Sequence, residues 1–239
     1  MADALTFGGT DLSQWLVGFT VDRPLTAEVE LETIDVPGLD GVVLAGRRLR
    51  PLTIEVTATL RGETAAEVAA TRRALASALA TDGTSRLVLP DDPTVFYDAA
   101  LSGSTAMSRG YERPRCTLSF TVPDACGWSV EEHSASVSSS YPTQFEVGGN
   151  APTWPTFTAT TTKAYLGITK NGTLERYRVD GLASGGTLVV DMRAETTLFD
   201  GEERFVGSYY DYFALTPGNN SVSAFDGSDQ VLKWRERWV

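Results

Sequence analysis

Residues 52–60 read Leu-Thr-Ile-Glu-Val-Thr-Ala-Thr-Leu, so aliphatic side chains alternate strictly with Thr or Glu. A period of two describes a strand with one buried face and one exposed face. Directly afterwards, Thr64 and Glu67 have the spacing of a helix capping box, and an alanine-rich run follows. Residues 86–89 return to an apolar strand pattern. One helix, at about residues 64–80, therefore interrupts a chain that is otherwise patterned as strands.

The helix is predicted to be only weakly amphipathic. Val68, Leu75 and Leu79 fall on one stripe, but Arg72 interrupts it. After the helix, the pair Asp82-Gly83 is expected to supply the left-handed residue that ends it.

The N-terminal half contains further strand patterns, at residues 6–7, 17–22, 28–36, 86–89, 95–101 and 115–122. Between the strands at 28–36 and 52–60 lies the loop Val-Pro-Gly-Leu-Asp-Gly. Its turn dipeptides Pro37-Gly38 and Asp40-Gly41 predict a compact double bend.

Residues 134–140 are serine-rich and uncharged, which suits a linker or a solvated edge segment. We place a domain boundary there, which gives an N-terminal domain of residues 1–133 and a C-terminal domain of residues 134–239. In the second domain, Asn171-Gly172 and Asp200-Gly201 each predict a two-residue hairpin turn. Short strands are predicted around these turns, at residues 156–162, 187–191, 222–225 and 231–238. Closely spaced strands with turns between them predict a β-sandwich.

The residue content argues against an enzyme. The only histidine, His133, has no cysteine or second histidine near it in sequence, which makes it a poor metal ligand or catalytic base. No serine lies in a Gly-x-Ser-x-Gly elbow, and the adjacent carboxylate pairs point to opposite sides of an extended chain. We therefore predict no catalytic residues, no metal site and no cofactor.

Charge and hydropathy exclude further classes. The formal net charge of −11 argues against a phosphate-binding surface. No stretch reaches the roughly 18 uncharged apolar residues of a membrane helix, and the sequence start lacks the basic region of a secretory signal. Cys116 falls on the apolar face of a predicted strand, where a free thiol behaves as a small hydrophobe. A disulfide to Cys126 is the less favoured alternative.

Aromatic residues are concentrated in the second half of the chain. Trp154, Tyr209 and Tyr210 could form a stacking platform for a glycan. The favoured reading is packing in the sandwich core or in a subunit interface, partly because Leu232, Trp234 and Trp238 are predicted to share one strand face. A lectin-like module for host recognition remains the alternative function.

The order of these parts resembles the distal tail proteins of siphoviruses, the long-tailed, non-contractile phages. The segments that carry the resemblance are residues 7–12, 36–41, 52–60, 64–80, 86–93, 116–120, 149–155, 188–191, 213–220 and 234–238. The resemblance implies an N-terminal belt domain, within which Pro37, Gly38, Asp40 and Gly41 form a structural loop, and a C-terminal galectin-like β-sandwich.

The resemblance also implies a function without chemistry. Six copies would form a hub ring between the tail tube and the tail tip or baseplate, with a channel through which DNA passes as cargo. The peripheral domains would attach tip, tail-associated or receptor-binding proteins. The protein would be made in the host bacterial cytoplasm and end in the virion tail tip, with no membrane insertion.

Overall fold

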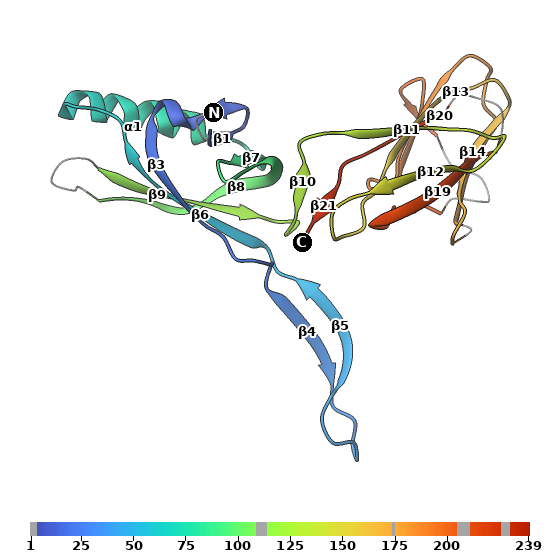
Figure 1. Cartoon of the computed structure of the whole chain (residues 1–239), viewed down its shortest axis with the longest axis horizontal. Helices are drawn as coiled ribbons and strands as arrows, with labels where there is room; N and C mark the ends of the chain where they lie inside the picture. Colours follow the sequence, from blue (N-terminus) through green and yellow to red (C-terminus); the bar gives the residue numbers. More distant parts are fainter. Residues whose placement is uncertain (1–3, 109–113, 174, 205–210, 226–229) are drawn as a thin grey trace. The chain divides into compact units, whose positions relative to one another are not determined.

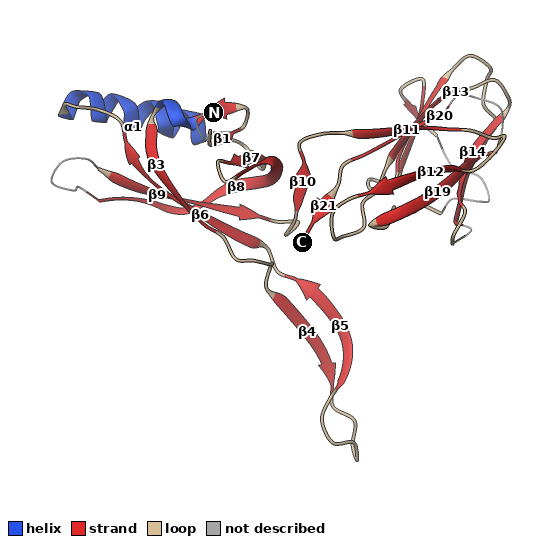
Figure 2. Cartoon of the chain, in the orientation of Figure 1, coloured by secondary structure: helices blue, strands red, loops and turns tan. Residues whose placement is uncertain are grey.

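The structure, a computed structural model, describes residues 4–108, 114–173, 175–204, 211–225 and 230–239. Strands dominate it and a single α-helix is present among these residues, so the predicted mainly β class is confirmed (Figures 1 and 2). The chain divides into two compact units. The first runs to Val130 and includes Val239, and the second is Glu131–Trp238.

The first unit is built on one antiparallel sheet with the strand order β2-β1-β7-β8-β9-β6-β3, and β10 pairs with β8. A short 3-10 helix, Leu12–Gln14, lies between β2 and β3. The strands of this sheet are β1 (Thr6–Phe7), β2 (Thr10–Asp11), β3 (Leu16–Asp22), β6 (Leu52–Leu60), β7 (Ser85–Leu89), β8 (Asp92–Ser108), β9 (Arg115–Val122) and β10 (Gly127–Ser129).

The alternation of β6 produces the core of this unit. Its five aliphatic side chains are buried, and the Thr and Glu residues between them are more exposed. On the neighbouring strand β9, Phe120 pairs with Ile54 and Leu118 pairs with Val56, and all four are inaccessible to solvent. The half-buried strand predicted from the alternation is therefore confirmed.

The helix α1 (Ala65–Leu79) begins at the predicted cap. The Glu67 N–H donates to Thr64 Oγ1 at 3.2 Å, and the Glu67 carboxylate accepts from the Glu63 N–H at 2.8 Å, a bond that lowers the pKa of Glu67. At the other end, Ala80 is already extended, so the left-handed Gly83 lies in the following turn and does not end the helix. No helix in the described ranges is long and apolar enough to cross a membrane.

The second unit is a sandwich of two antiparallel sheets, and the predicted β-sandwich is confirmed. One sheet has the order β11-β20-β13-β16-β17-β18 and the other β12-β19-β14-β15. Their bounds are β11 (His133–Val137), β12 (Thr143–Val147), β13 (Thr156–Thr160), β14 (Tyr165–Lys170), β15 (Glu175–Asp180), β16 (Thr187–Asp191), β17 (Thr196–Phe199), β18 (Glu202–Glu203), β19 (Gly218–Ala224), β20 (Gln230–Trp234) and, off both sheets, β21 (Arg237–Trp238). Side chains from both sheets meet in one core around Phe157, Tyr177 and Leu232.

The structure tests three local predictions in this unit. Residues 134–137 of the serine-rich segment lie in the edge strand β11, so the edge reading holds for this part, and residues 138–140 follow the strand. At Asp200-Gly201 the two-residue turn is confirmed, with both residues at positive φ. Four residues, not two, separate the pair Lys170 and Glu175, so the turn predicted at Asn171 was too short.

The C-terminal strand was also predicted too long. The run expected at residues 231–238 breaks after β20, and β21 is a separate strand. Leu232 and Trp234 are buried in the sandwich core, whereas Trp238 is half-buried, so the three do not share one strand face. Cys116 and Cys126 are both buried free thiols, and the disulfide alternative does not hold.

Candidate functional site: the hairpin arm

A two-stranded arm projects from the first unit, built from β4 (Val29–Ile34) and β5 (Val43–Leu49) (Figure 1). The two strands form a sheet of their own and pair with no other strand in the described residues. β5 was missed from the sequence, where this region was read as a strand followed by a loop. A bulge between Glu32 and Thr33 shifts the register.

The predicted double bend is the tip of this arm. The Leu39 N–H donates to the Val36 carbonyl at 3.1 Å, which closes a turn around Pro37 and Gly38. Gly38 has φ +85°, and a type II turn requires such a residue after proline. Gly41 also has positive φ, at +86°. The four residues predicted as a structural loop, Pro37, Gly38, Asp40 and Gly41, therefore all lie at the arm's tip.

A cluster of charges holds the base of the arm together. Glu30 accepts hydrogen bonds from Arg48 Nη2 and from Arg50 Nη2, both at 2.8 Å. The Arg48 Nε–H also donates to the same carboxylate, at 3.2 Å. Hydrogen bonding by Arg48, aided by the charge of Arg50, lowers the pKa of Glu30 below its ordinary value.

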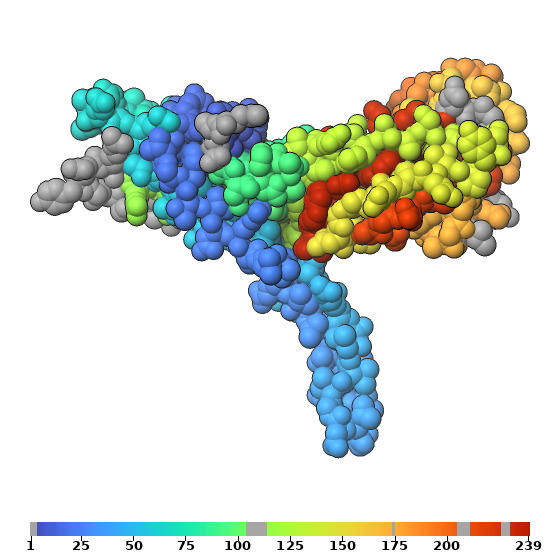
Figure 3. Space-filling model, in the orientation of Figure 1, coloured from blue at the N-terminus to red at the C-terminus, as the bar shows by residue number. Residues whose placement is uncertain are grey.

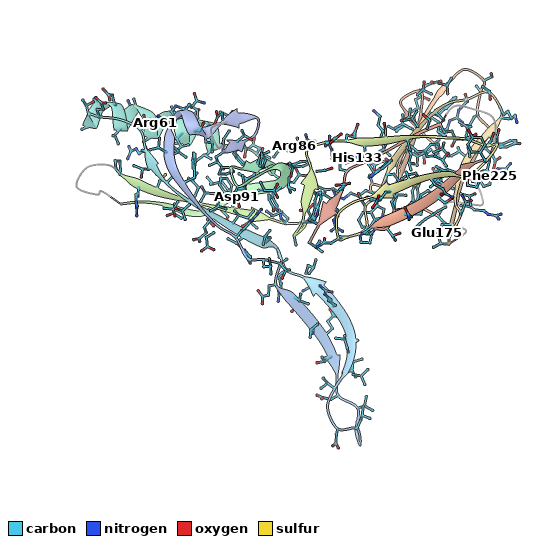
Figure 4. The ribbon with its side chains drawn as sticks, viewed as in Figure 1. Arg61, Arg86, Asp91, His133, Glu175 and Phe225 are labelled. Atoms are coloured by element: carbon cyan, nitrogen blue, oxygen red, sulfur yellow. The ribbon has the colours of Figure 1, made fainter. Side chains whose placement is uncertain are left out.

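The rest of the arm exposes aliphatic side chains on both faces. Leu31 and Leu44 lie on one face and are 57% and 59% exposed, and Ile34 on the opposite face is 55% exposed. Leu39 and Val42 at the tip are each 55% exposed. In Figure 4 the side chains of the arm extend from both sides of the ribbon, and in Figure 3 the arm stands clear of the body of its unit.

An arm of this kind is not explained by the stability of the single chain. An isolated two-stranded hairpin is at best marginally stable in water, because neither face is covered. Contiguous exposed apolar surface in a soluble protein marks an interaction site. The arm therefore has the chemistry of a protein–protein contact, and this is the candidate functional site.

The ion-pair cluster predicts how the arm responds to pH. Because the folded-state pKa of Glu30 is lowered, its pairing stabilises the hairpin above the unfolded pKa of about 4.5 and is lost as pH falls through the lower folded value. We expect the amide NMR shifts of Leu31 and Arg47, a cross-strand pair, to move toward unfolded values below about pH 4.5. The Glu30→Gln variant should lack this pH-dependent change. An identical acid response in the variant would contradict the assignment.

Of the three aromatic residues in the glycan platform predicted from the sequence, the structure describes Trp154. Trp154 is half-buried, packs against the sandwich core and has the Arg237 guanidinium 5.5 Å from its ring centre. Tyr209 and Tyr210 lie outside the described residues. A glycan platform at these three positions stays a prediction.

His133, the one histidine of the sequence, packs in the second unit against an aromatic ring. His133 stacks on Trp234, with ring centres 5.9 Å apart, and its Nε2 lies 3.6 Å from Glu236 Oε1. His133 is marked on the second unit in Figure 4. Within the part of the chain that the structure describes, no three His, Cys, Asp or Glu residues are grouped closely enough to hold a metal ion.

Comparison with protein families gives two matches that follow one another along the chain. Residues 11–122 match the phage tail protein RIFT-related domain, and residues 148–238 match the siphovirus-type tail component, C-terminal domain. A search of curated protein sequences gives no match.

Comparison with solved structures gives a close likeness in fold. The Dit (gp 19.1) protein of phage SPP1, described as a paradigm of the hub adsorption apparatus in phages infecting Gram-positive bacteria, superposes with a TM-score of 0.86 at 19% identity, over 99% of both chains. A chain of the phage P2 baseplate in its activated conformation with Ca gives a TM-score of 0.47 at 9% identity, over 90% of both chains.

Proposed function

The chain belongs to the siphovirus distal tail protein family and is a component of the phage tail hub, and from this premise we propose that six copies close into a ring between the tail tube and the tail tip. In this proposal residues 1–133 build the ring, and residues 134–239 form domains at its periphery. The observation that carries the proposal is the arm, because no other described segment of the chain covers its exposed apolar faces.

The arm is suited to a contact between copies. It projects from one side of its unit, so a second copy can receive it on a different surface, and such a contact can be repeated from copy to copy. Such heterologous contacts generate rings when the rotation closes. The number six comes from the family resemblance and not from the arm.

The acidic character of the chain suits the proposed channel. With a formal net charge of −11 per copy, a ring of several copies carries a large net negative charge, which repels the phosphates of DNA. DNA would pass such a channel as cargo without binding to it.

The proposed partners follow from the position in the tail. One face of the ring would contact the tail tube protein, and the opposite face and the peripheral domains would carry tip, tail-associated or receptor-binding proteins. The protein would assemble in the bacterial cytoplasm and remain in the tail tip of the virion.

Solution mass tests the ring directly. We expect light scattering to show a particle of six 25.7 kDa chains, and negative-stain images to show a central hole. A strict monomer at every accessible concentration, both alone and with purified tail tubes, would contradict the ring. A compact dimer without a hole would favour the lectin-like alternative, and a glycan array would then be the next measurement.

A further inference from the structure

An apolar groove lies beside α1 in the first unit and has a volume of about 350 Å³. Leu75 and Leu79 of the helix form one wall, and Leu60, Leu101 and Cys116 of the sheet form the other. This volume falls within the range of about 300–1,000 Å³ that is usual for binding clefts. The mass of a ring would not show whether this groove is occupied.

The groove exists because the helix covers the sheet incompletely. Leu75 and Leu79 are the only two buried residues of α1, and the positions between them are small or polar. The weak apolar stripe predicted from the sequence therefore leaves a space between the helix and the strands that no side chain described in the structure fills. Ala76, exposed on the helix, contributes a short side chain to the lining of this space and does not obstruct it.

Arg72 gives the groove a positive charge. It is exposed, contributes to the lining and forms no ion pair among the described residues. Among the described residues that line the groove, the one other polar group is the Cys116 thiol, and burial raises the pKa of that thiol, so it stays uncharged. The groove is thus an apolar slot with one unpaired cation.

The tip of the arm has the complementary character. Between Thr33 and Gly46 the only charged residues are Asp35 and Asp40, and the remaining side chains are mostly aliphatic. The Pro37-Gly38 turn also fixes the shape of the tip before any contact is made, which lowers the entropy cost of binding.

We propose that the arm tip of one copy inserts into the groove beside α1 of the next copy, with Leu39 in the apolar slot and Asp40 facing Arg72. The occupant is a second copy because the tip of the arm is exposed and does not fill the groove of its own chain. Tip and groove are different surfaces, so the contact can be repeated head-to-tail from copy to copy, as the proposed ring on which this inference rests requires.

Disulfide trapping tests the contact. Two populations are prepared in the Cys116→Ala background, because the native thiol lines the same groove and would compete. One population carries Leu39→Cys and the other carries Ala76→Cys, with a small tag to distinguish their masses. On mixing with diamide, which is reduced as it oxidises the two thiols, we expect a covalent dimer containing one chain of each kind. A chain with both substitutions should form a ladder of covalent oligomers.

Leu25→Cys serves as the matched control for Leu39→Cys, because Leu25 is 99% exposed but precedes the arm strands. It should give no mixed dimer with Ala76→Cys. A mixed dimer with Leu25→Cys as abundant as with Leu39→Cys would overturn the inference, because it would report random collision.

A charge exchange provides a second readout that needs no cysteine. Arg72→Glu is expected to weaken self-association by about two- to fivefold, the range typical of an exposed ion pair, and adding Asp40→Arg should restore it. Failure of the double variant to recover would contradict the pairing of these two residues.

The outcomes separate this inference from the ring itself. A ring of full mass without the mixed disulfide overturns the groove contact and leaves the proposed function standing. A mixed disulfide without a ring supports the contact and contradicts closure. If neither the ring nor the mixed disulfide forms, both the groove contact and the proposed ring are overturned.

Discussion

Replacing Ile34, Leu39 and Leu44 together by serine is expected to leave a folded chain that stays monomeric where the native chain assembles. Each of these side chains is more than half exposed in the single chain, so its loss removes little from either core. In an interface, burying an aliphatic side chain contributes roughly 1.5–3 kcal/mol. Three losses should therefore raise the dissociation constant by at least about 10³-fold.

Sedimentation velocity measures this effect, and circular dichroism checks that the variant is folded. Leu25→Ser is the matched control, because Leu25 is an equally apolar and even more exposed residue outside the arm strands. It should assemble like the native chain. Normal assembly of the triple variant would exclude the arm as the main contact between copies.

The Phe157→Ala variant is expected to lose about 3–5 kcal/mol of unfolding free energy in the second unit. Phe157 is inaccessible to solvent on β13, and its ring meets the edge of Tyr177 with centres 6.1 Å apart. Truncation leaves a cavity in the middle of the sandwich, and the cavity can be filled only if the two sheets shift toward each other. A loss of this size is a large part of the 5–15 kcal/mol that is typical of a whole domain.

Hydrogen exchange with mass spectrometry separates the two units in this experiment. Peptides from residues 131–238 should exchange faster in the variant, whereas peptides from β6 and β9 in the first unit should be unchanged. Tyr141→Ala is the control, because that aromatic side chain is 69% exposed and its removal should cost less than about 0.5 kcal/mol. An equal loss in both variants would contradict the core assignment.

Strands with one buried face were predictable from the sequence. In β6 the alternation of aliphatic and polar residues corresponds to the two faces of the sheet, residue by residue. The start of the helix was also predictable, from Thr64 and Glu67, because a helix cap is formed by residues that are close in sequence. The weak stripe on that helix was also correct, although its consequence for the groove appears only when the strands are in place.

The arm was not predictable in the same way. β5 contains Val43 and Leu44 and then Arg47 and Arg48, so no alternation marks a buried face. Both faces of β5 are exposed. Alternation of apolar and polar residues arises when one face of a strand is buried, so β5 has no such pattern. The turn dipeptides Pro37-Gly38 and Asp40-Gly41 between two aliphatic segments were the local indications of a hairpin.

Edge positions account for the other differences. β11 is rich in serine because it forms the border of its sheet, where one edge meets water, and composition alone does not distinguish such a strand from a linker. The helix ends at Leu79, within one residue of its predicted end, whereas the local pattern did not mark the break after Trp234.

The exposed arm has one consequence for copies that never reach a tail. Arg47 and Arg48 lie on β5 and are exposed, and trypsin-like proteases recognise the peptide bonds that follow them, whereas Pro51 blocks cleavage after Arg50. A ribbon without a covering layer opens locally at little cost, so these bonds are within reach of a protease in an orphan chain. Once a neighbour covers the arm, opening must also break that contact, and cleavage slows. Surplus copies would thus be degraded while assembled ones persist, which would help to match the amount of this protein to the number of tails under construction.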